Sequence, residues 1–266
     1  MTLSRAPIPD GAQGGLALAF PGPAPDGEEP IALLSFAQRG DMKFAEGERA
    51  ENRALFLRES GIDPSDAIGL ELSHSRRFLF PERGDDVAAL ARTALGADGL
   101  ILRDRALAAT VTVADCMPIW LLDRGSGAFG LLHSGWRGTG ILGLAVEAMV
   151  ERFGSNPASI AVVLGPAIGP CCYSVPEERA AEFAAEFGEA SVARRDGIWS
   201  LDLRAANVSL AERSGIGHLL SIEACTSCDE RLGSYRRQGP ANFTRMLAVC
   251  GRSSRMPDNL PAGSIA

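Results

Sequence analysis

The 266-residue sequence has little histidine, almost no lysine and no long hydrophobic run. It contains three histidines, and Lys43 is the one lysine among 26 basic residues, so the others are arginines. No stretch approaches the roughly 20 consecutive apolar residues of a membrane span. The N-terminal segment also lacks the apolar core of a secretory signal. These absences predict a cytoplasmic protein without a membrane partner.

The charge balance argues against a nucleic-acid partner. The formal net charge is −7, whereas proteins that bind a phosphate backbone usually carry a basic balance or a basic stripe. Several of the arginines lie next to glycine turns, where a planar guanidinium can hold a single phosphate or carboxylate at two points. The excess of arginine over lysine is nevertheless explained first by the base composition of the genome, and the charge balance alone argues against a nucleic acid.

Six cysteines are present in a chain that lacks an export signal, and this combination favours free thiols or metal ligands over disulfides. The cysteines are Cys116, Cys171, Cys172, Cys225, Cys228 and Cys250.

Hydrophobic periodicity predicts more strands than helices, with many strands joined by short turns. This pattern favours an α+β fold of stacked mixed sheets over a regular doubly wound parallel sheet. We expect a loose N-terminal segment over residues 1–14 and a single domain over residues 15–266. The predicted strands are 16–20, 31–36, 67–72, 77–80, 107–113, 118–122, 128–132, 160–164, 219–223 and 246–249, and the predicted helices are 48–59, 140–153, 176–187 and 203–213.

Three segments each place a metal-competent side chain at the end of an apolar strand, namely His74, Cys116 and His133. Two histidines and one cysteine with an open fourth position form a catalytic zinc arrangement, whereas structural zinc sites usually close with four protein ligands. Thiolate and imidazole also suit copper. The spacings of 42 and 17 residues match no short metal signature. Taken singly, a histidine at a strand end is more often a hydrogen-bonded structural residue, and a buried cysteine is usually a small hydrophobe.

Four segments carry a resemblance to a known family. VADCMPIWLLD, LLHSGWRGTG, GPAIGPCCYSV and SYRRQG occur in this order and closely resemble the YfiH family. This family is also labelled multicopper polyphenol oxidoreductase (laccase-like), peptidoglycan editing factor, or purine nucleoside phosphorylase. The resemblance runs from about Phe36 to about Arg245.

The resemblance implies one domain with a four-layer α/β/β/α arrangement and zinc held by His74, Cys116 and His133. It also implies phosphorolysis of adenosine, inosine, guanosine and methylthioadenosine by inorganic phosphate, together with adenosine deamination. The chain is expected to be a monomer or a homodimer. It departs from the family at Leu72, where glutamine is common, and at Ser174, where glutamate is common. A true multicopper laccase would need many imidazoles, so copper chemistry is expected only from copper in the zinc site.

For phosphorolysis, the candidate phosphate clamps are Arg137 and either Arg236 or Arg237, helped by backbone N–H groups of the glycine turn. For deamination, zinc would lower the pKa of its bound water toward roughly 7. Asp115 is the candidate proton shuttle, although it reaches the site only if the chain bends there. A turn-stabilising role for Asp115 is an equal alternative.

The remaining candidates also have structural interpretations. Trp136 and Tyr173 either stack on the purine or belong to the core. The pair Cys171-Cys172 either lines the pocket or is a buried structural pair. Cys225 and Cys228 form a CxxC that could be redox-active or half of a structural zinc site, but without a second CxxC the first interpretation is two thiols of little consequence.

Two other functions compete with the zinc enzyme. One is a cysteine hydrolase, including an enzyme that edits peptidoglycan precursors, with Cys116 as nucleophile and His133 as base. The other is a non-enzymatic, zinc-stabilised interaction module, against which the open metal position argues.

Overall fold

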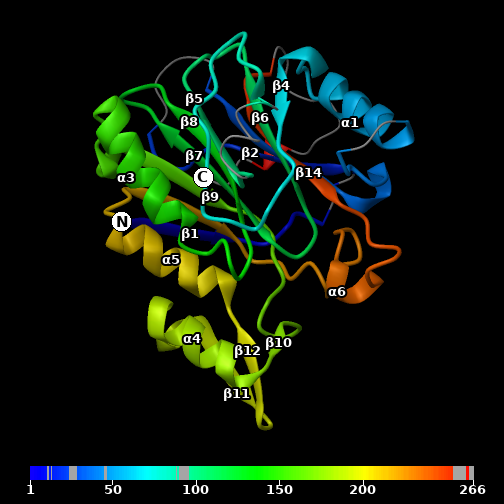
Figure 1. The fold of residues 1–266 in the computed structure, drawn as a ribbon, viewed down its shortest axis with the longest axis vertical. Coiled ribbons are helices and arrows are strands. Elements are labelled where there is room, and N and C mark those ends of the chain that lie inside the picture. The colour runs from blue at the N-terminus through cyan, green and yellow to red at the C-terminus, as the bar shows by residue number, and fades with distance from the viewer. Residues whose placement is uncertain are drawn as a thin grey trace.

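A computed structural model describes residues 1–10, 12, 14–23, 29–44, 47–87, 89, 96–253 and 262–263 of the chain. Its strands form two six-stranded sheets and one three-stranded sheet, and helices lie outside them (Figure 1). The α+β class expected from the sequence is confirmed, and both large sheets are mixed. Residues 254–261 and 264–266 of the expected domain lie outside the described residues.

The first large sheet contains the central hydrophobic strands and has the order β1-β13-β9-β7-β8-β5. Strands β1, β13 and β9 run parallel, whereas β7 is antiparallel to both of its neighbours. Its members are β1 (Thr2–Ala6), β5 (Gly99–Leu102), β7 (Met117–Asp123), β8 (Phe129–Ser134), β9 (Ile160–Leu164) and β13 (His218–Ile222).

Strand β7 is buried along its whole length, which explains its almost uninterrupted apolar sequence MPIWLLD. Its Trp120 is fully buried, and the indole Nε1 donates a hydrogen bond of 2.7 Å to the backbone oxygen of Val249 in the other large sheet. The turn after β7 is fixed by Asp123, whose carboxylate accepts hydrogen bonds from the backbone N–H groups of Gly125 and Ser126.

The second large sheet has the order β15-β2-β3-β14-β6-β4. Its central strands are antiparallel, and β15 and β4 add to its edges in parallel. Its members are β2 (Gly15–Leu18), β3 (Ile31–Ser35), β4 (Ala67–Gly69), β6 (Ala108–Val113), β14 (Met246–Gly251) and β15 (Ala262–Gly263).

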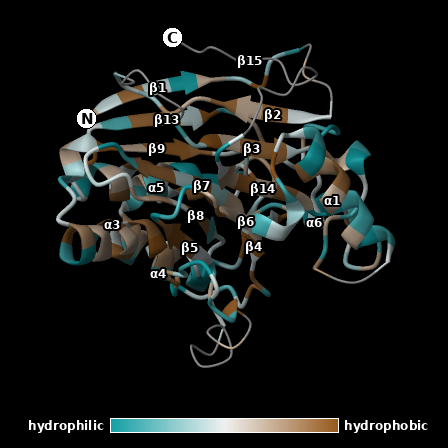
Figure 2. Ribbon diagram, turned by 90° about the horizontal axis from the view of Figure 1, so that it is seen from above, coloured by the Kyte–Doolittle hydropathy of each residue, from teal (hydrophilic) through white to brown (hydrophobic). Residues whose placement is uncertain are grey.

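The two large sheets pack face to face, and helices cover their outer faces (Figure 2). One apolar cluster joins side chains of both sheets, including Trp120, Leu131, Val111 and Ala248. The other face of the first sheet packs on α3 (Ile141–Phe153) and α5 (Leu203–Arg213). The outer face of the second sheet packs on α1 (Glu48–Glu59) through Phe56 and Leu57.

Local signals set the helix ends. Asp202 caps α5 by accepting a hydrogen bond from the N–H of Ala205. Gly154 ends α3 in the left-handed conformation that favours glycine, and its N–H bonds to carbonyls of the last turn. Pro176 precedes α4 (Glu177–Phe187), which carries two glutamates in its first turn. The remaining elements are β10 (Ser174–Val175), β11 (Val192–Arg195) and β12 (Ile198–Leu201), which form the small sheet, and α6 (Tyr235–Gln238).

Within the segment 1–14 that the sequence predicts to be loose, Thr2–Ala6 pairs along its length with β13, and the side chains of Ala6 and Ile8 are buried. One expectation is wrong. The expected strand 77–80 is reduced to a single bridge between Leu79 and Leu100. Within the described residues, every helix is too short or too polar to cross a membrane.

Candidate active site

The candidate site lies where the chain passes from one large sheet to the other. Strand β6 belongs to the second sheet and β7 to the first, so residues 114–116 form the crossing between them. At the open end of the β7–β8 hairpin, Pro118 pairs with His133 and Met117 with Ser134. This register brings Cys116, just before β7, next to the end of β8. His74 joins them from the loop after β4, with a φ of 57°.

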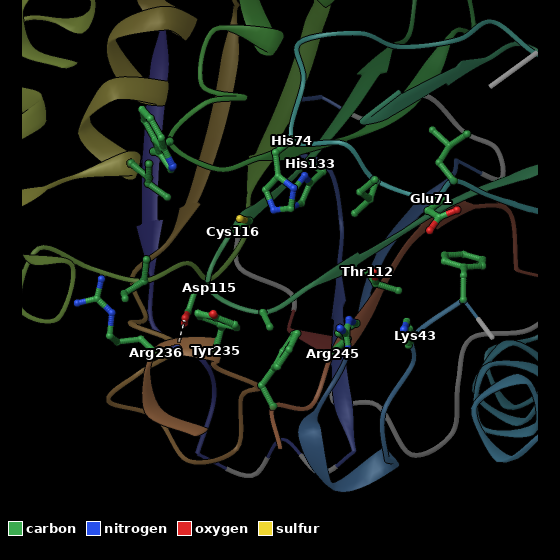
Figure 3. A pocket seen from close by; sticks show the side chains of 18 of the residues that line it. Lys43, Glu71, His74, Thr112, Asp115, Cys116, His133, Tyr235, Arg236 and Arg245 are labelled. Atoms are coloured by element: carbon green, nitrogen blue, oxygen red, sulfur yellow. Dashed lines mark hydrogen bonds between the residues drawn. The ribbon is translucent and has the colours of Figure 1, made fainter. Parts of the chain in front are cut away.

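The three expected metal ligands converge. The Sγ of Cys116 and ring nitrogens of His74 and His133 all lie within 4.8 Å of one another. The two imidazole rings are 5.0 Å apart between centroids and nearly perpendicular, at 82°. Figure 3 shows the sulfur and both rings pointing toward a common space. These three side chains could therefore hold one metal ion.

Asp98, which the sequence reasoning missed, orients this group. Its side chain is fully buried, and its Oδ1 lies 2.9 Å from Nδ1 of His133 and accepts a 2.9 Å hydrogen bond from the backbone N–H of His74. Its Oδ2 accepts from the N–H and hydroxyl groups of Ser73 and Ser75. Because Nδ1 of His133 faces Asp98, Nε2 is left available for a metal ion, an arrangement common around protein metal ligands.

Hydrogen bonds and neighbouring charges favour the charged forms of Asp98, Cys116 and His133. Burial would raise the pKa of Asp98, but hydrogen bonds from His133 and Ser75 outweigh burial and hold that pKa well below its ordinary value. Burial likewise opposes ionisation of Cys116, yet the charge and hydrogen bonds of His133 and His74 lower its pKa to about 6. Burial would lower the pKa of His133, but Cys116 and Asp98 raise it to about 10. Without a metal, Cys116 and His133 therefore form a thiolate–imidazolium pair.

The glycine turn that follows β8 is explained by close packing. A Cβ atom at Gly135 would lie 2.7 Å from Sγ of Cys116, which leaves no room for any other residue. The turn is closed by Thr139, whose N–H and hydroxyl both bond to the backbone oxygen of Gly135. The glycine after Ser134 is thus needed to let the sulfur approach the histidines.

A cavity of about 580 Å³ opens beside the three ligands (Figure 3). Aromatic side chains line it together with charged ones from several elements. Its lining includes Phe44, Trp136, Tyr173, Tyr235 and Phe243 among the aromatic residues, and Lys43, Glu71, Asp115, Arg236 and Arg245 among the charged ones.

Most of the predicted substrate-site residues reach this cavity. Trp136, Tyr173 and Arg236 line it with the three metal-ligand candidates. Arg236 donates to the backbone oxygens of Cys172 and Ser174 and to the Ser174 hydroxyl, which fixes its guanidinium beside Tyr173.

Three predicted residues are not among those that line the cavity. Arg137 is exposed and stacks on Trp136, 5.0 Å from the ring centroid. The guanidinium of Arg237 donates to backbone oxygens of Thr226, Asp229 and Leu232. Cys172 contributes its backbone oxygen to Arg236, while its sulfur joins a separate group of cysteines.

Asp115 reaches the cavity because the chain bends as the sequence argument required. Its φ of 80° breaks the regular alternation of a strand, so that both Asp115 and Cys116 face the cavity. Its Oδ1 accepts a 2.7 Å hydrogen bond from the hydroxyl of Thr226, and its Oδ2 a 2.7 Å bond from the N–H of Arg236. The carboxylate therefore ties two separate loops to the site.

Several residues that line the cavity were also not foreseen. Lys43, Tyr235 and Arg245 line the cavity from distant parts of the chain, and Arg245 lies 3.4 Å from Asp41 and stacks on Phe243. The one available signal was composition, since Lys43 is the single lysine in an arginine-rich chain.

The family relationship follows from comparison with known proteins. A family model described as multi-copper polyphenol oxidoreductase laccase matches residues 39–253. The chain belongs to this family. The resemblance noted in the sequence is confirmed. A crystal structure of the Bacillus licheniformis hypothetical protein YfiH superposes on this chain with a TM-score of 0.75 at 26% identity, covering 85% of this chain and 97% of that one.

Several relatives of this chain carry the name purine nucleoside phosphorylase. The Deinococcus radiodurans protein is 34% identical over 208 residues, which cover 77% of this chain and 78% of the relative. YlmD of Geobacillus stearothermophilus is 35% identical over 179 residues, which cover 64% of this chain and 65% of the relative. The match thus spans just under two thirds of the length of YlmD.

Proposed function

We propose that the chain is a zinc-dependent purine nucleoside phosphorylase, acting on adenosine, inosine, guanosine and methylthioadenosine, with adenosine deaminase activity. The observation that carries the proposal is the convergence of His74, Cys116 and His133 at the edge of a cavity with aromatic and cationic walls. The relatives named purine nucleoside phosphorylase support the same activity. The four-layer α/β/β/α order belongs to this proposal and is supported by the packing of α3, α5 and α1 on the outer sheet faces.

The donor set fits zinc. Two imidazoles and one thiolate suit zinc or copper, and three protein ligands leave a position open for a reactant. Asp98 fixes the ring of His133 and the backbone of His74, as expected for a residue that orients metal ligands. A bound zinc ion would act as a Lewis acid beside the substrate and supply an activated water for deamination.

The cavity suits a nucleoside and an anion. Trp136, Tyr173 and Tyr235 are aromatic residues of the cavity lining, beside which a purine would be bound. Burial first, and then the nearby Cys116 thiolate, raise the pKa of Tyr173 to about 12, so its hydroxyl stays protonated and can donate a hydrogen bond. Lys43, Arg236 and Arg245 are the lysine and arginines that line the cavity and could provide positive charge for inorganic phosphate.

In phosphorolysis, a phosphate oxygen bonds to C1′ of the ribose as the bond between C1′ and the purine nitrogen breaks. The electron pair leaves with the purine, which takes up a proton, and ribose 1-phosphate is the other product. Positive charge develops on the sugar, while negative charge is shared by the phosphate and the purine. We assign the phosphate to Lys43, Arg236 and Arg245, because Arg137 and Arg237 have their guanidinium groups outside the cavity.

We assign Asp115 mainly to positioning, because both of its oxygens accept short hydrogen bonds from Thr226 and Arg236. Asp115→Asn keeps an oxygen for one of these bonds but cannot shuttle a proton. For a positioning role we expect KM to rise with a smaller change in kcat. If Asp115 is instead the proton shuttle, kcat for deamination falls by about 10²–10⁴-fold at unchanged KM.

The proposal is tested by incubating the zinc-loaded protein with adenosine, with and without inorganic phosphate, and identifying the products. Adenine and ribose 1-phosphate that appear only with phosphate support phosphorolysis, and inosine without phosphate supports deamination. His133→Ala serves as the inactive control. Absence of all three products with zinc-loaded wild-type protein contradicts the proposal.

A cysteine hydrolase is a second candidate, because the lowered pKa of Cys116 and the raised pKa of His133 describe an activated thiolate. This function needs Cys116 free of metal. Alkylation of the zinc-loaded protein, with and without a chelator, separates the two. We expect Cys116 to be protected until zinc is removed, whereas full labelling in the presence of zinc favours the hydrolase.

A further inference from the structure

Four cysteines outside the metal centre of the cavity come together from two distant segments. Cys171 and Cys172 follow the glycine-proline turn after β9, and Cys225 and Cys228 follow β13. The four sulfur atoms all lie within 4.8 Å of one another. Sγ of Cys228 is 3.6 Å from that of Cys171 and 3.4 Å from that of Cys172.

These separations match a metal site with four sulfur ligands. A tetrahedral zinc ion has Zn–S bonds of about 2.3 Å, which places its sulfurs about 3.8 Å apart. A disulfide needs sulfurs at about 2.05 Å, and all four cysteines are free in the structure. Four sulfurs at such separations enclose a space of the size that one zinc ion fills.

The backbone is folded so that the four cysteine side chains point toward one another. The N–H groups of Cys172 and Tyr173 both bond to the backbone oxygen of Gly169, and this tight turn brings two consecutive cysteines to one side. On the other segment, the N–H groups of Cys228 and Asp229 both bond to the backbone oxygen of Cys225. Each half of the group is thus a compact turn.

The two turns are also joined to each other. Ala167 and Cys225 form a bridge, to which the N–H of Thr226 contributes by bonding to the oxygen of Ala167. The N–H of Gly169 donates a 3.2 Å hydrogen bond to Sγ of Cys225. Backbone N–H groups that point at sulfur stabilise metal-bound thiolates. The sulfurs are therefore held in place by backbone contacts of their own segments.

We propose that Cys171, Cys172, Cys225 and Cys228 bind a second zinc ion in a closed, structural Cys₄ site. Four protein ligands leave no open position, which distinguishes this site from the centre formed by His74, Cys116 and His133. Two of the four cysteines are exposed and two are half-buried, so an ion can enter from solvent.

This zinc site would hold two parts of the cavity wall. The backbone oxygen of Cys172 accepts a 2.9 Å hydrogen bond from Arg236, which lines the cavity. Thr226, between the other two cysteines, donates a 2.7 Å hydrogen bond to Asp115. Binding of zinc fixes both segments and thereby fixes Arg236 and Asp115.

The test is the zinc content of the purified full-length chain, measured by native mass spectrometry. We expect two zinc ions per chain for the wild type, one for Cys228→Ser and one for His133→Ala. Cys250→Ala, which removes a buried thiol far in sequence from both groups, should keep two. X-ray absorption of His133→Ala should give sulfur ligands alone, at about 2.3 Å.

Differential alkylation of the wild type covers the case in which a variant fails to fold. We expect peptides containing the four cysteines to stay unlabelled until a chelator is added. One zinc per chain with all four thiols labelled before chelation overturns the proposal. A mass lower by two hydrogens, with a disulfide within the group, also overturns it. A result that overturns the Cys₄ site would not count against metal binding by His74, Cys116 and His133.

Discussion

Asp98 provides the sharpest prediction, because one buried carboxylate orients two of the three metal-ligand candidates. Asp98→Asn keeps the shape of the side chain and removes its charge. Its Oδ1 can still accept from His133 and His74, but its amide nitrogen then faces the N–H groups of Ser73 and Ser75. The two serine hydroxyls can rotate to accept a hydrogen bond, whereas the two backbone N–H groups cannot.

The expected magnitudes follow from these contacts. Losing a charged acceptor costs about 1.5–3 kcal/mol for each hydrogen bond. Two lost backbone bonds, one of them long at 3.3 Å, reduce the free energy of unfolding by about 2–5 kcal/mol. Replacing a residue that orients metal ligands typically weakens metal affinity by about 10–100-fold. We therefore expect zinc affinity to fall by that factor, which corresponds to about 1.4–2.7 kcal/mol.

The assay is a zinc competition with a chromophoric chelator, run beside chemical denaturation of the metal-free protein. Asp123→Asn is the matched control, since Asp123 is also fully buried and accepts from Gly125, Ser126 and Ser159, but at the opposite end of β7. We expect the control to lose comparable stability and keep its zinc affinity. If Asp98→Asn retains wild-type zinc affinity, or if both variants lose it equally, the proposed orienting role is refuted.

Three other perturbations give measurable outcomes. Gly135→Ala should lower zinc affinity at least tenfold in the same competition assay, because its Cβ would displace Sγ of Cys116. Gly143→Ala is the control and should keep wild-type zinc affinity, because its Cβ would meet only ordinary contacts. In metal-free protein the lowered pKa of Cys116 keeps the thiolate present above pH 6, so its alkylation rate should fall as pH drops through about 6. Burial raises the pKa of Cys250, so this control thiol should remain unlabelled in the folded chain at every pH tested. A midpoint near pH 9 for the labelling of Cys116 would contradict the thiolate–imidazolium pair. Trp120→Phe should reduce the free energy of unfolding by about 2 kcal/mol in chemical denaturation, because the hydrogen bond between the sheets is lost; an unchanged midpoint would show that this bond contributes nothing.

The fold was predictable wherever a segment buries one continuous apolar surface. The strands around Ile119 and Val162 are confirmed because a continuous apolar run reflects burial of the whole strand, and the helix 140–153 is confirmed because its buried residues recur at helical spacing. Strand β1 was missed because its sequence, TLSRA, is half polar, and its order depends on parallel pairing with a strand more than 200 residues away. Pairing over such a distance leaves no mark on the local sequence.

The candidate site was predictable only in part, and for a related reason. His74, Cys116 and His133 have side chains whose chemistry is conspicuous, so their grouping could be suggested from residue type and family resemblance. Asp98 and Arg245 are ordinary charged residues whose importance depends on what lies beside them in space. The cysteine pairs at 171–172 and 225–228 could not be joined by spacing, because the bridge between Ala167 and Cys225 that unites them is a tertiary contact.

The location of the site follows from how the chain changes sheets. In a regular strand Asp115 and Cys116 would face opposite sides, and only one of them could reach the cavity. Between β6 and β7 the chain leaves one sheet for the other, and the φ of 80° at Asp115 turns both side chains toward the same space. His74 has a similarly unusual φ of 57°, held by the hydrogen bond from its N–H to Asp98. Backbone conformations of this kind cost free energy and persist where the surroundings fix them, which is common at functional sites. Buried Asp98 and the Thr226–Asp115 contact are the surroundings that fix them here, so removing either contact should disturb the grouping of His74, Cys116 and His133 before it disturbs the sheets.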